Sequence, residues 1–184
     1  MLSKGSQSLA DDHVALHKLL DELKTALSNR DVAVSYAKLD LFWAKLAVHI
    51  RAEHLHLFPS VLNGVTKADD DKVFVSALLP ETQSAIERLR SDHDFFMKQL
   101  AAAVETARSL INTSAPPVIG EELNVIKETV WQVEQRLADH NQVEESHIYR
   151  LAGIVLSPGE QAELAQRIDR ELQNRPARFA ANVW

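Results

Sequence analysis

The stretch His49-Ile-Arg-Ala-Glu53-His-Leu-His-Leu-Phe-Pro59 decides how this chain of 184 residues folds. It places a histidine and a glutamate four residues apart, and this spacing puts both side chains on one face of a helix, one turn above the other. The pattern returns as His140-Asn-Gln-Val-Glu144. The two copies predict two helices that each present an imidazole and a carboxylate on the same face.

Two further histidines, His13 and His93, lie in apolar stripes whose members follow each other in steps of three and four residues. The stripe around His13 runs from Leu9 to Leu27, and the stripe around His93 runs from Ile86 to Val104. This periodicity is typical of amphipathic helices. The chain is therefore expected to contain four long helices, each with one histidine on its apolar face.

Turn-forming residues set the expected limits of these helices. Breaks are expected at the turn 28–31, at Pro59 with Asn63-Gly64, at the loop 67–72 and at the linker 112–117. The expected helix starts are Ser8, Pro80 and Glu121. Ser157-Pro158-Gly159-Glu160 carries a proline and a glutamate at helix-start positions, which predicts a shorter fifth helix that ends before Pro176.

Residues 8–79 and 80–156 repeat one plan, a helix with histidine followed by a helix with His-x-x-x-Glu. Short connections between amphipathic helices favour antiparallel neighbours. We therefore expect an all-α fold, an up-down-up-down four-helix bundle with an additional C-terminal helix. The whole chain, 1–184, is read as a single domain, with the bundle at about 8–156 and a C-terminal extension at 157–184.

Composition narrows the functional classes. The formal net charge of -6 comes without a basic stripe, so nucleic acid is not an expected partner. The chain has no cysteine, which excludes disulfides and thiolate metal sites. No apolar run is long enough for a signal peptide or a membrane span. We expect a cytoplasmic protein without a membrane partner.

Counting along the antiparallel helices places the four histidines, His13, His49, His93 and His140, at one level. The carboxylates of Glu53 and Glu144 lie one layer towards the open end of the bundle, and two apolar layers form the floor. Each buried polar group without a partner costs roughly 1–3 kcal/mol. Six such groups therefore need a common partner, and the alternative to a metal is a set of paired Glu–His hydrogen bonds.

A pair of metal ions suits this set of donors. Neutral imidazole and carboxylate favour Fe, Zn, Ni or Cu over Ca or Mg. Six donors exceed the four of an ordinary zinc site and fit two ions bridged by Glu53 and Glu144, with one coordination position left open. Zn or Mn can substitute for Fe at such a site.

The order H, HxxxE, H, HxxxE, with Leu57-Phe58-Pro59 after the first HxxxE, resembles the haemerythrin-like, or HHE cation-binding, family over roughly residues 8–152. The resemblance implies two Fe ions in a non-haem di-iron centre. It implies as metal ligands His13, His49, Glu53, His93, His140 and Glu144. The chain departs from the family pattern at His54, where many relatives carry a second glutamate.

Other histidines and aromatic residues lie near the predicted ligands in the sequence. Glu53-x-x-His56 and Glu144-x-x-His147 match the spacing of ferritin-like di-iron bundles and offer a rival ligand set. His17 is a less favoured alternative to His13, and His54 is expected to be peripheral.

We interpret three aromatic side chains as packing residues: Trp43, Trp131 and Tyr149. Four aspartates are adjacent to the predicted ligand histidines in sequence, but neighbours in sequence do not face each other on a helix, so adjacency alone does not indicate a hydrogen bond to the histidine rings: Asp12, Asp92, Asp94 and Asp139.

Three functions follow from this interpretation. The first is a non-haem di-iron protein that binds or senses dioxygen or another small diatomic ligand, or takes part in iron and redox homeostasis. The second is a ferritin-like or peroxidase-like di-iron oxidoreductase. The third is a metal-stabilised helical interaction module. A binding or sensing protein is favoured over an enzyme, no catalytic residue is assigned, and the C-terminal extension is a candidate surface for a homodimer.

Overall fold

A computed structural model describes residues 2–69, 78–112 and 115–179. Within these ranges all regular structure is helical, so the prediction of an all-α chain is confirmed. No helix among them is both long enough and apolar enough to cross a membrane.

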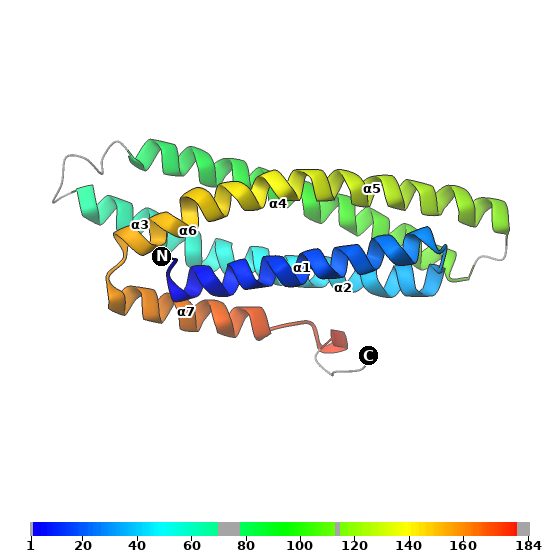
Figure 1. The fold of residues 1–184 in the computed structure, drawn as a ribbon, viewed down its shortest axis with the longest axis horizontal. Coiled ribbons are helices and arrows are strands. Elements are labelled where there is room, and N and C mark those ends of the chain that lie inside the picture. The colour runs from blue at the N-terminus through cyan, green and yellow to red at the C-terminus, as the bar shows by residue number, and fades with distance from the viewer. Residues whose placement is uncertain (1, 70–77, 113–114, 180–184) are drawn as a thin grey trace.

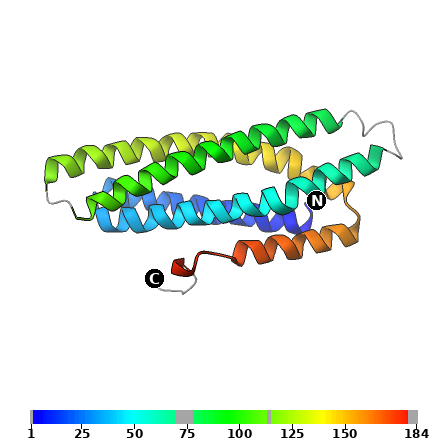
Figure 2. The same ribbon diagram turned by 180° about the vertical axis from the view of Figure 1, so that it is seen from behind.

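Four long helices lie side by side along the length of the molecule, and each runs opposite to the one before it (Figure 1, Figure 2). They are α1 (Lys4–Ser28), α2 (Val32–Ala52), α4 (Leu78–Leu110) and α5 (Pro116–Val143). Helix α2 packs against both α1 and α4, and α5 packs against both α4 and α1. This arrangement brings one histidine from each helix towards a common axis.

Helices α2 and α5 do not end at their glutamates. Each passes through one π-helical turn, η1 (Glu53–Leu57) or η2 (Glu144–Ile148), and continues as α3 (Phe58–Asp69) or α6 (Tyr149–Val155). Helical structure continues through both Pro59 and Asn63-Gly64, contrary to the expectation that the helix ends there. Pro59 lies in the first turn of α3, where the π-turn already displaces the hydrogen-bond pattern and a missing amide costs little.

Two other helix starts differ from those expected. Helix α1 begins at Lys4 rather than near Ser8, because Ser3 caps it by accepting a hydrogen bond of 3.2 Å from the backbone N–H of Ser6. Helix α5 begins at Pro116 rather than near Glu121, because proline fits the first helical turn, where no amide is needed. The third helix is described from Leu78, close to the expected Pro80.

The fifth helix, α7 (Pro158–Gln173), lies against α1 and α2 (Figure 1) and is followed by the short η3 (Ala177–Phe179). The predicted capping box is present, since Ser157 and Glu160 each bind the other's backbone N–H. Leu164 and Ile168 are fully buried, so the apolar side of α7 packs on its own chain. The last part of the predicted C-terminal extension, residues 180–184, lies outside the described residues.

Two apolar clusters form the core. The inner cluster contains both layers predicted beneath the histidines, namely Leu16, Phe96, Leu46, Leu137, Leu20, Leu100, Phe42 and Val133. The capping cluster lies on the other side of the histidines and glutamates and includes Leu9, Leu57, Phe58, Leu89, Ile148 and Tyr149. The end of the bundle predicted to be open is therefore closed by apolar side chains.

Candidate metal centre

The structure brings all six predicted ligands together between the two apolar clusters, and none of their side chains is exposed. They form two groups of four donors, and within each group the donor atoms lie within 4.8 Å of one another. The first group, which we call position 1, is His13, His49, Glu53 and Glu144. The second group, position 2, is Glu53, His93, His140 and Glu144. Both glutamates belong to both groups, as carboxylates that bridge two ions would.

The donor atoms of position 1 face one another. His13 Nε2 lies 3.1 Å from His49 Nε2 and 3.3 Å from Glu144 Oε2. His49 Nε2 lies 3.5 Å from Glu53 Oε1. Nitrogen and oxygen atoms at these separations can bind one ion together.

Position 2 repeats this geometry with the other oxygen of each glutamate. His93 Nε2 lies 2.9 Å from His140 Nε2 and 3.4 Å from Glu53 Oε2. Glu144 Oε1 lies 2.9 Å from His140 Nε2. Each carboxylate thus directs one oxygen to each position.

Two atoms of the centre have no conventional partner. Glu53 Oε2 and Glu144 Oε1 are buried and accept no hydrogen bond, although imidazole nitrogens are close. A buried carboxylate oxygen without a hydrogen bond is costly. A cation placed between them would satisfy these oxygens and the facing Nε2 atoms, and their chemistry suits iron, zinc or manganese. The residues present therefore fit a metal centre.

The outward nitrogen of every ligand histidine is also occupied. His49 Nδ1 lies 3.0 Å from Asp12 Oδ2, and His140 Nδ1 lies 3.3 Å from Asp92 Oδ2. His13 Nδ1 lies 2.9 Å from Glu145 Oε1. A carboxylate on Nδ1 accepts the ring proton and leaves the Nε2 lone pair free for a metal.

His93 has a different outward partner, because its Nδ1 lies 2.8 Å from Nε2 of His54. Burial is the main cause that lowers the pKa of His54 below its ordinary value, so its ring is neutral at neutral pH. The expectation that His54 is peripheral is therefore wrong. His54 holds the ring of a candidate ligand.

Asp12 and Asp92 also act in a way that sequence adjacency did not indicate. Each precedes a ligand histidine on its own helix but binds the histidine of the neighbouring helix. Asp94 and Asp139, which also flank ligand histidines, are exposed. An aspartate stands directly before the first histidine of each half of the sequence, and this repetition was the signal that could have identified Asp12 and Asp92 as partners of the histidines.

Tyr149, which sequence analysis assigned to packing alone, also contacts the candidate metal ligands. Its ring is fully buried, and its hydroxyl donates a hydrogen bond of 2.9 Å to Glu53 Oε1. The π-turn explains its position, since the backbone N–H of Tyr149 bonds to the carbonyl of Glu144, five residues earlier. The residue five places after the glutamate therefore returns to the metal centre.

The same π-turns turn the rival histidines away. His56 points towards Glu171, with 3.9 Å between His56 Nε2 and Glu171 Oε2, and belongs to neither donor group. His147 also belongs to neither group. His17 contacts the side-chain nitrogen of Asn141 at 3.3 Å instead of the centre. The ferritin-like ligand set is not assembled.

The imidazoles and carboxylates of the centre stabilise each other's charged forms. Burial lowers the pKa of His49, but the carboxylates of Glu53 and Asp12 outweigh it and raise that pKa to about 10. Burial opposes ionisation of Glu53, yet His49 and His93 hold its pKa well below the ordinary value. In the absence of a cation His49 therefore keeps its proton at neutral pH, and a metal that binds there must displace it.

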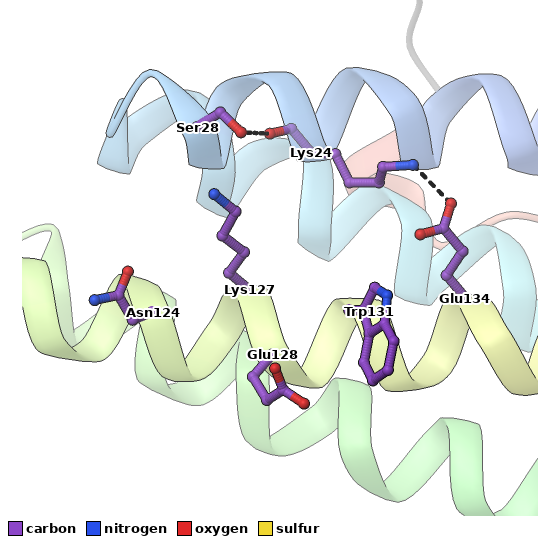
Figure 3. Close-up of a pocket in the computed structure, with 7 residues that line it drawn as sticks. All are labelled: Lys24, Ser28, Asn124, Lys127, Glu128, Trp131 and Glu134. Carbon is purple, nitrogen blue, oxygen red and sulfur yellow. Dashed lines mark hydrogen bonds and ion pairs between the residues drawn. The ribbon is translucent and has the colours of Figure 1, made fainter.

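Surface grooves lie elsewhere. The groove in Figure 3 lies between α1 and α5, holds about 460 Å³ and is lined by Lys24, Ser28, Asn124, Lys127, Glu128, Trp131 and Glu134. Lys24 forms an ion pair there with Glu134 at 2.6 Å.

Trp131 is 54% exposed, so its assignment to packing is wrong, whereas Trp43 packs on the inner cluster. A second groove, of about 680 Å³, is lined in part by Glu145, the partner of His13.

Comparisons of this chain with protein-family models, with curated proteins and with solved structures found no match.

Proposed function

We propose that the chain is a haemerythrin-like non-haem di-iron protein, built as an up-down-up-down four-helix bundle with an additional helix, that binds or senses a small diatomic ligand such as dioxygen. The observation that supports the proposal is the pair of buried four-donor groups that share Glu53 and Glu144. Four imidazoles and two carboxylates form a donor set rich in nitrogen and poor in charge.

Two iron ions would be held by His13 and His49 at position 1 and by His93 and His140 at position 2, with Glu53 and Glu144 between them. Iron supplies reversible binding or reduction of a diatomic ligand, which zinc does not offer. The protein keeps the ligand rings in the binding tautomer through their Nδ1 partners.

The surroundings of the centre select the size and polarity of the ligand. Phe96 and Phe58 pack against the rings of His140 and His93, with ring centroids 5.3 and 6.1 Å apart respectively. Both phenylalanines are fully buried. An apolar diatomic molecule dissolves readily in such a core, whereas a charged or larger substrate loses its hydration there without compensation. The shielded site therefore favours a diatomic ligand.

An absorption titration tests this proposal. Protein loaded with ferrous iron without air is mixed with dioxygen and, separately, with nitric oxide. We expect a new visible band with either gas that disappears when the gas is removed. Spectra that stay unchanged with both gases would refute diatomic binding, even where two ions are bound.

One observation favours a second function, a peroxide-handling oxidoreductase. The phenol of Tyr149 lies within hydrogen-bond distance of the candidate ligand Glu53 and offers a proton inside the centre. Such a group can serve as a general acid when a reduced oxygen species leaves. Steady turnover of hydrogen peroxide by the iron-loaded protein, reduced at least tenfold by Tyr149→Phe, would support this function over reversible binding.

A further inference from the structure

The two metal positions are related by the internal repeat of the chain. The contact of Asp12 with His49 corresponds to the contact of Asp92 with His140, since each aspartate precedes one candidate ligand histidine and contacts another on the next helix. The contact of Glu145 with His13 corresponds to the contact of His54 with His93, since Glu145 and His54 each follow a candidate bridging glutamate by one residue. The two halves can therefore be compared residue by residue.

The comparison exposes one difference at the centre itself. Phe58 follows Glu53 by five residues, and Tyr149 follows Glu144 by five. Both are fully buried. The Phe58 ring stacks on His93 with centroids 6.1 Å apart and planes at 10°, and the Tyr149 ring stacks on His13 at 5.8 Å and 22°. The two rings occupy equivalent places and differ only by the hydroxyl.

The hydroxyl of Tyr149 lies among the donors of position 1. Its oxygen is 2.9 Å from Glu53 Oε1, 3.3 Å from His13 Nε2 and 3.4 Å from Glu144 Oε2. Neighbouring donors around a six-coordinate ion with bonds of about 2.1 Å lie roughly 3 Å apart. The phenol oxygen thus has the spacing of a further donor towards three of the four donors of position 1.

We propose that Tyr149 supplies its phenol oxygen as a fifth protein donor at position 1, and that position 2, where Phe58 stands, keeps the corresponding place free for an external ligand. This inference rests on the proposed di-iron function and adds to it that the two ions have different donors and different roles. On ligation the O–H bond breaks, the oxygen forms its bond to the ion with a lone pair, and the proton leaves to solvent. No electron is transferred in this step.

The consequence is a centre with two unlike ions. A phenolate adds negative charge at position 1 and stabilises the ferric state there, because an anionic oxygen donor favours the more highly charged cation. Position 2 has only neutral imidazoles and the shared carboxylates. The diatomic ligand is therefore directed to the ion held by His93 and His140.

Resonance Raman spectroscopy tests the inference directly. The full chain is loaded with ferrous iron, its iron content is measured, and the air-oxidised protein is excited within its visible absorption band. Enhanced ring vibrations of an iron-bound tyrosinate are expected in the unaltered chain. Tyr149→Phe should lose them while still binding two ions, and Phe58 already shows that a phenylalanine fits the equivalent place.

The chain offers a matched control, because Tyr36 is its only other tyrosine. Tyr36→Phe should keep the vibrations at full intensity. Their absence from an unaltered chain that binds two ions would overturn the phenolate assignment and leave the di-iron proposal intact. Their persistence in Tyr149→Phe would also overturn it. A chain that binds no iron would refute both proposals.

Discussion

Each of the four candidate ligand histidines uses both ring nitrogens, one towards the centre and one towards an outer partner. The outer partners Asp12 and Asp92 cross between helices, so each aspartate fixes the ring of a neighbour rather than that of its own helix. Two helices are thereby tied together at the depth of the centre. The geometry of the centre therefore depends on residues that cannot touch a metal themselves.

This dependence predicts the behaviour of Asp12→Asn and Asp92→Asn. Each should weaken metal binding by roughly 10–100-fold, because the ring loses a carboxylate that accepts its proton. Competition with a chelator of known affinity measures the change. Asp94→Asn and Asp139→Asn alter exposed residues that also flank ligand histidines and should leave affinity unchanged. Equal losses in all four variants would contradict the crossed pairing.

The metal-free protein should show a distinct pH profile. The pKa of His49 rises from 6.5 to about 10, so its contribution to stability is present below pH 6.5 and is lost as pH rises through about 10. The pKa values of Glu53 and Glu144 fall below 4.5, so their contributions are present above pH 4.5 and are lost on acidification.

Urea unfolding in the presence of a chelator measures this profile. The midpoint should fall when pH is raised from about 5.5 to about 9, because the unfolded histidine releases its proton while the folded one retains it. Metal affinity should rise over the same interval, since the ion competes with those protons. A chelated protein whose midpoint rises towards pH 9 would contradict the protonated state of His49.

The juxtaposition of the six candidate ligands was predictable because a helix repeats regularly. Counting in steps of three and four from His13 to Leu16, or from His49 to Glu53, placed the donors and the apolar floor at correct depths. The outer partners and Tyr149 were not found in this way. They depend on how each helix is rotated about its axis and on a local departure from the α-helical period.

At the scale of the elements, the two π-turns are that departure. Each begins at a glutamate of the centre, and the residue five positions later, Phe58 or Tyr149, donates its N–H to the glutamate carbonyl. The turn carries the aromatic ring towards the histidines and moves His56 and His147 away. An uninterrupted α-helix would have kept His56 and His147 on the same face as the glutamates, which is the ferritin-like spacing that sequence analysis kept as a rival ligand set.

Helix α7 is fastened to α1 at a close approach that requires glycine. A Cβ on Gly5 would lie 3.1 Å from Ile168 Cδ1 and 3.2 Å from Ala165 Cα, which is backbone. Gly5→Ala should therefore lower the free energy of unfolding by roughly 1–3 kcal/mol.

Gly120→Ala provides the matched control. No atom lies within 4 Å of its added Cβ, and Gly120 lies within α5. This variant should gain up to about 1 kcal/mol, because alanine favours helix over glycine. Urea unfolding of both proteins decides the matter, and equal effects of the two substitutions would contradict the close packing of α7 on α1.

At the scale of the whole molecule, the centre lies between the inner and capping clusters and joins all four long helices. Sequence patterning predicted the inner cluster but left the other end open, because about half of the capping cluster comes from α3, α6 and α7, which lie beyond the four long helices. Their packing depends on contacts between segments distant in sequence. The centre is consequently sealed by segments whose packing on the bundle could not be read from the periodicity of the sequence.

A metal bound between four helices should stabilise the fold as a unit. With free metal at about 100 times its dissociation constant, binding adds about 2.7 kcal/mol to the free energy of unfolding. Thermal unfolding with and without a chelator should show this gain. Iron that leaves the unfolding temperature unchanged would contradict a centre shared by the four helices.

The most direct measurement is the metal content of the iron-loaded chain and of three histidine variants. We predict two iron ions per chain, a loss of at least one ion in both His49→Ala and His140→Ala, and full retention in His56→Ala, whose side chain lies outside the donor groups. Fewer than one ion in the unaltered chain, or equal retention in all three variants, would contradict a metal centre formed by these histidines and glutamates.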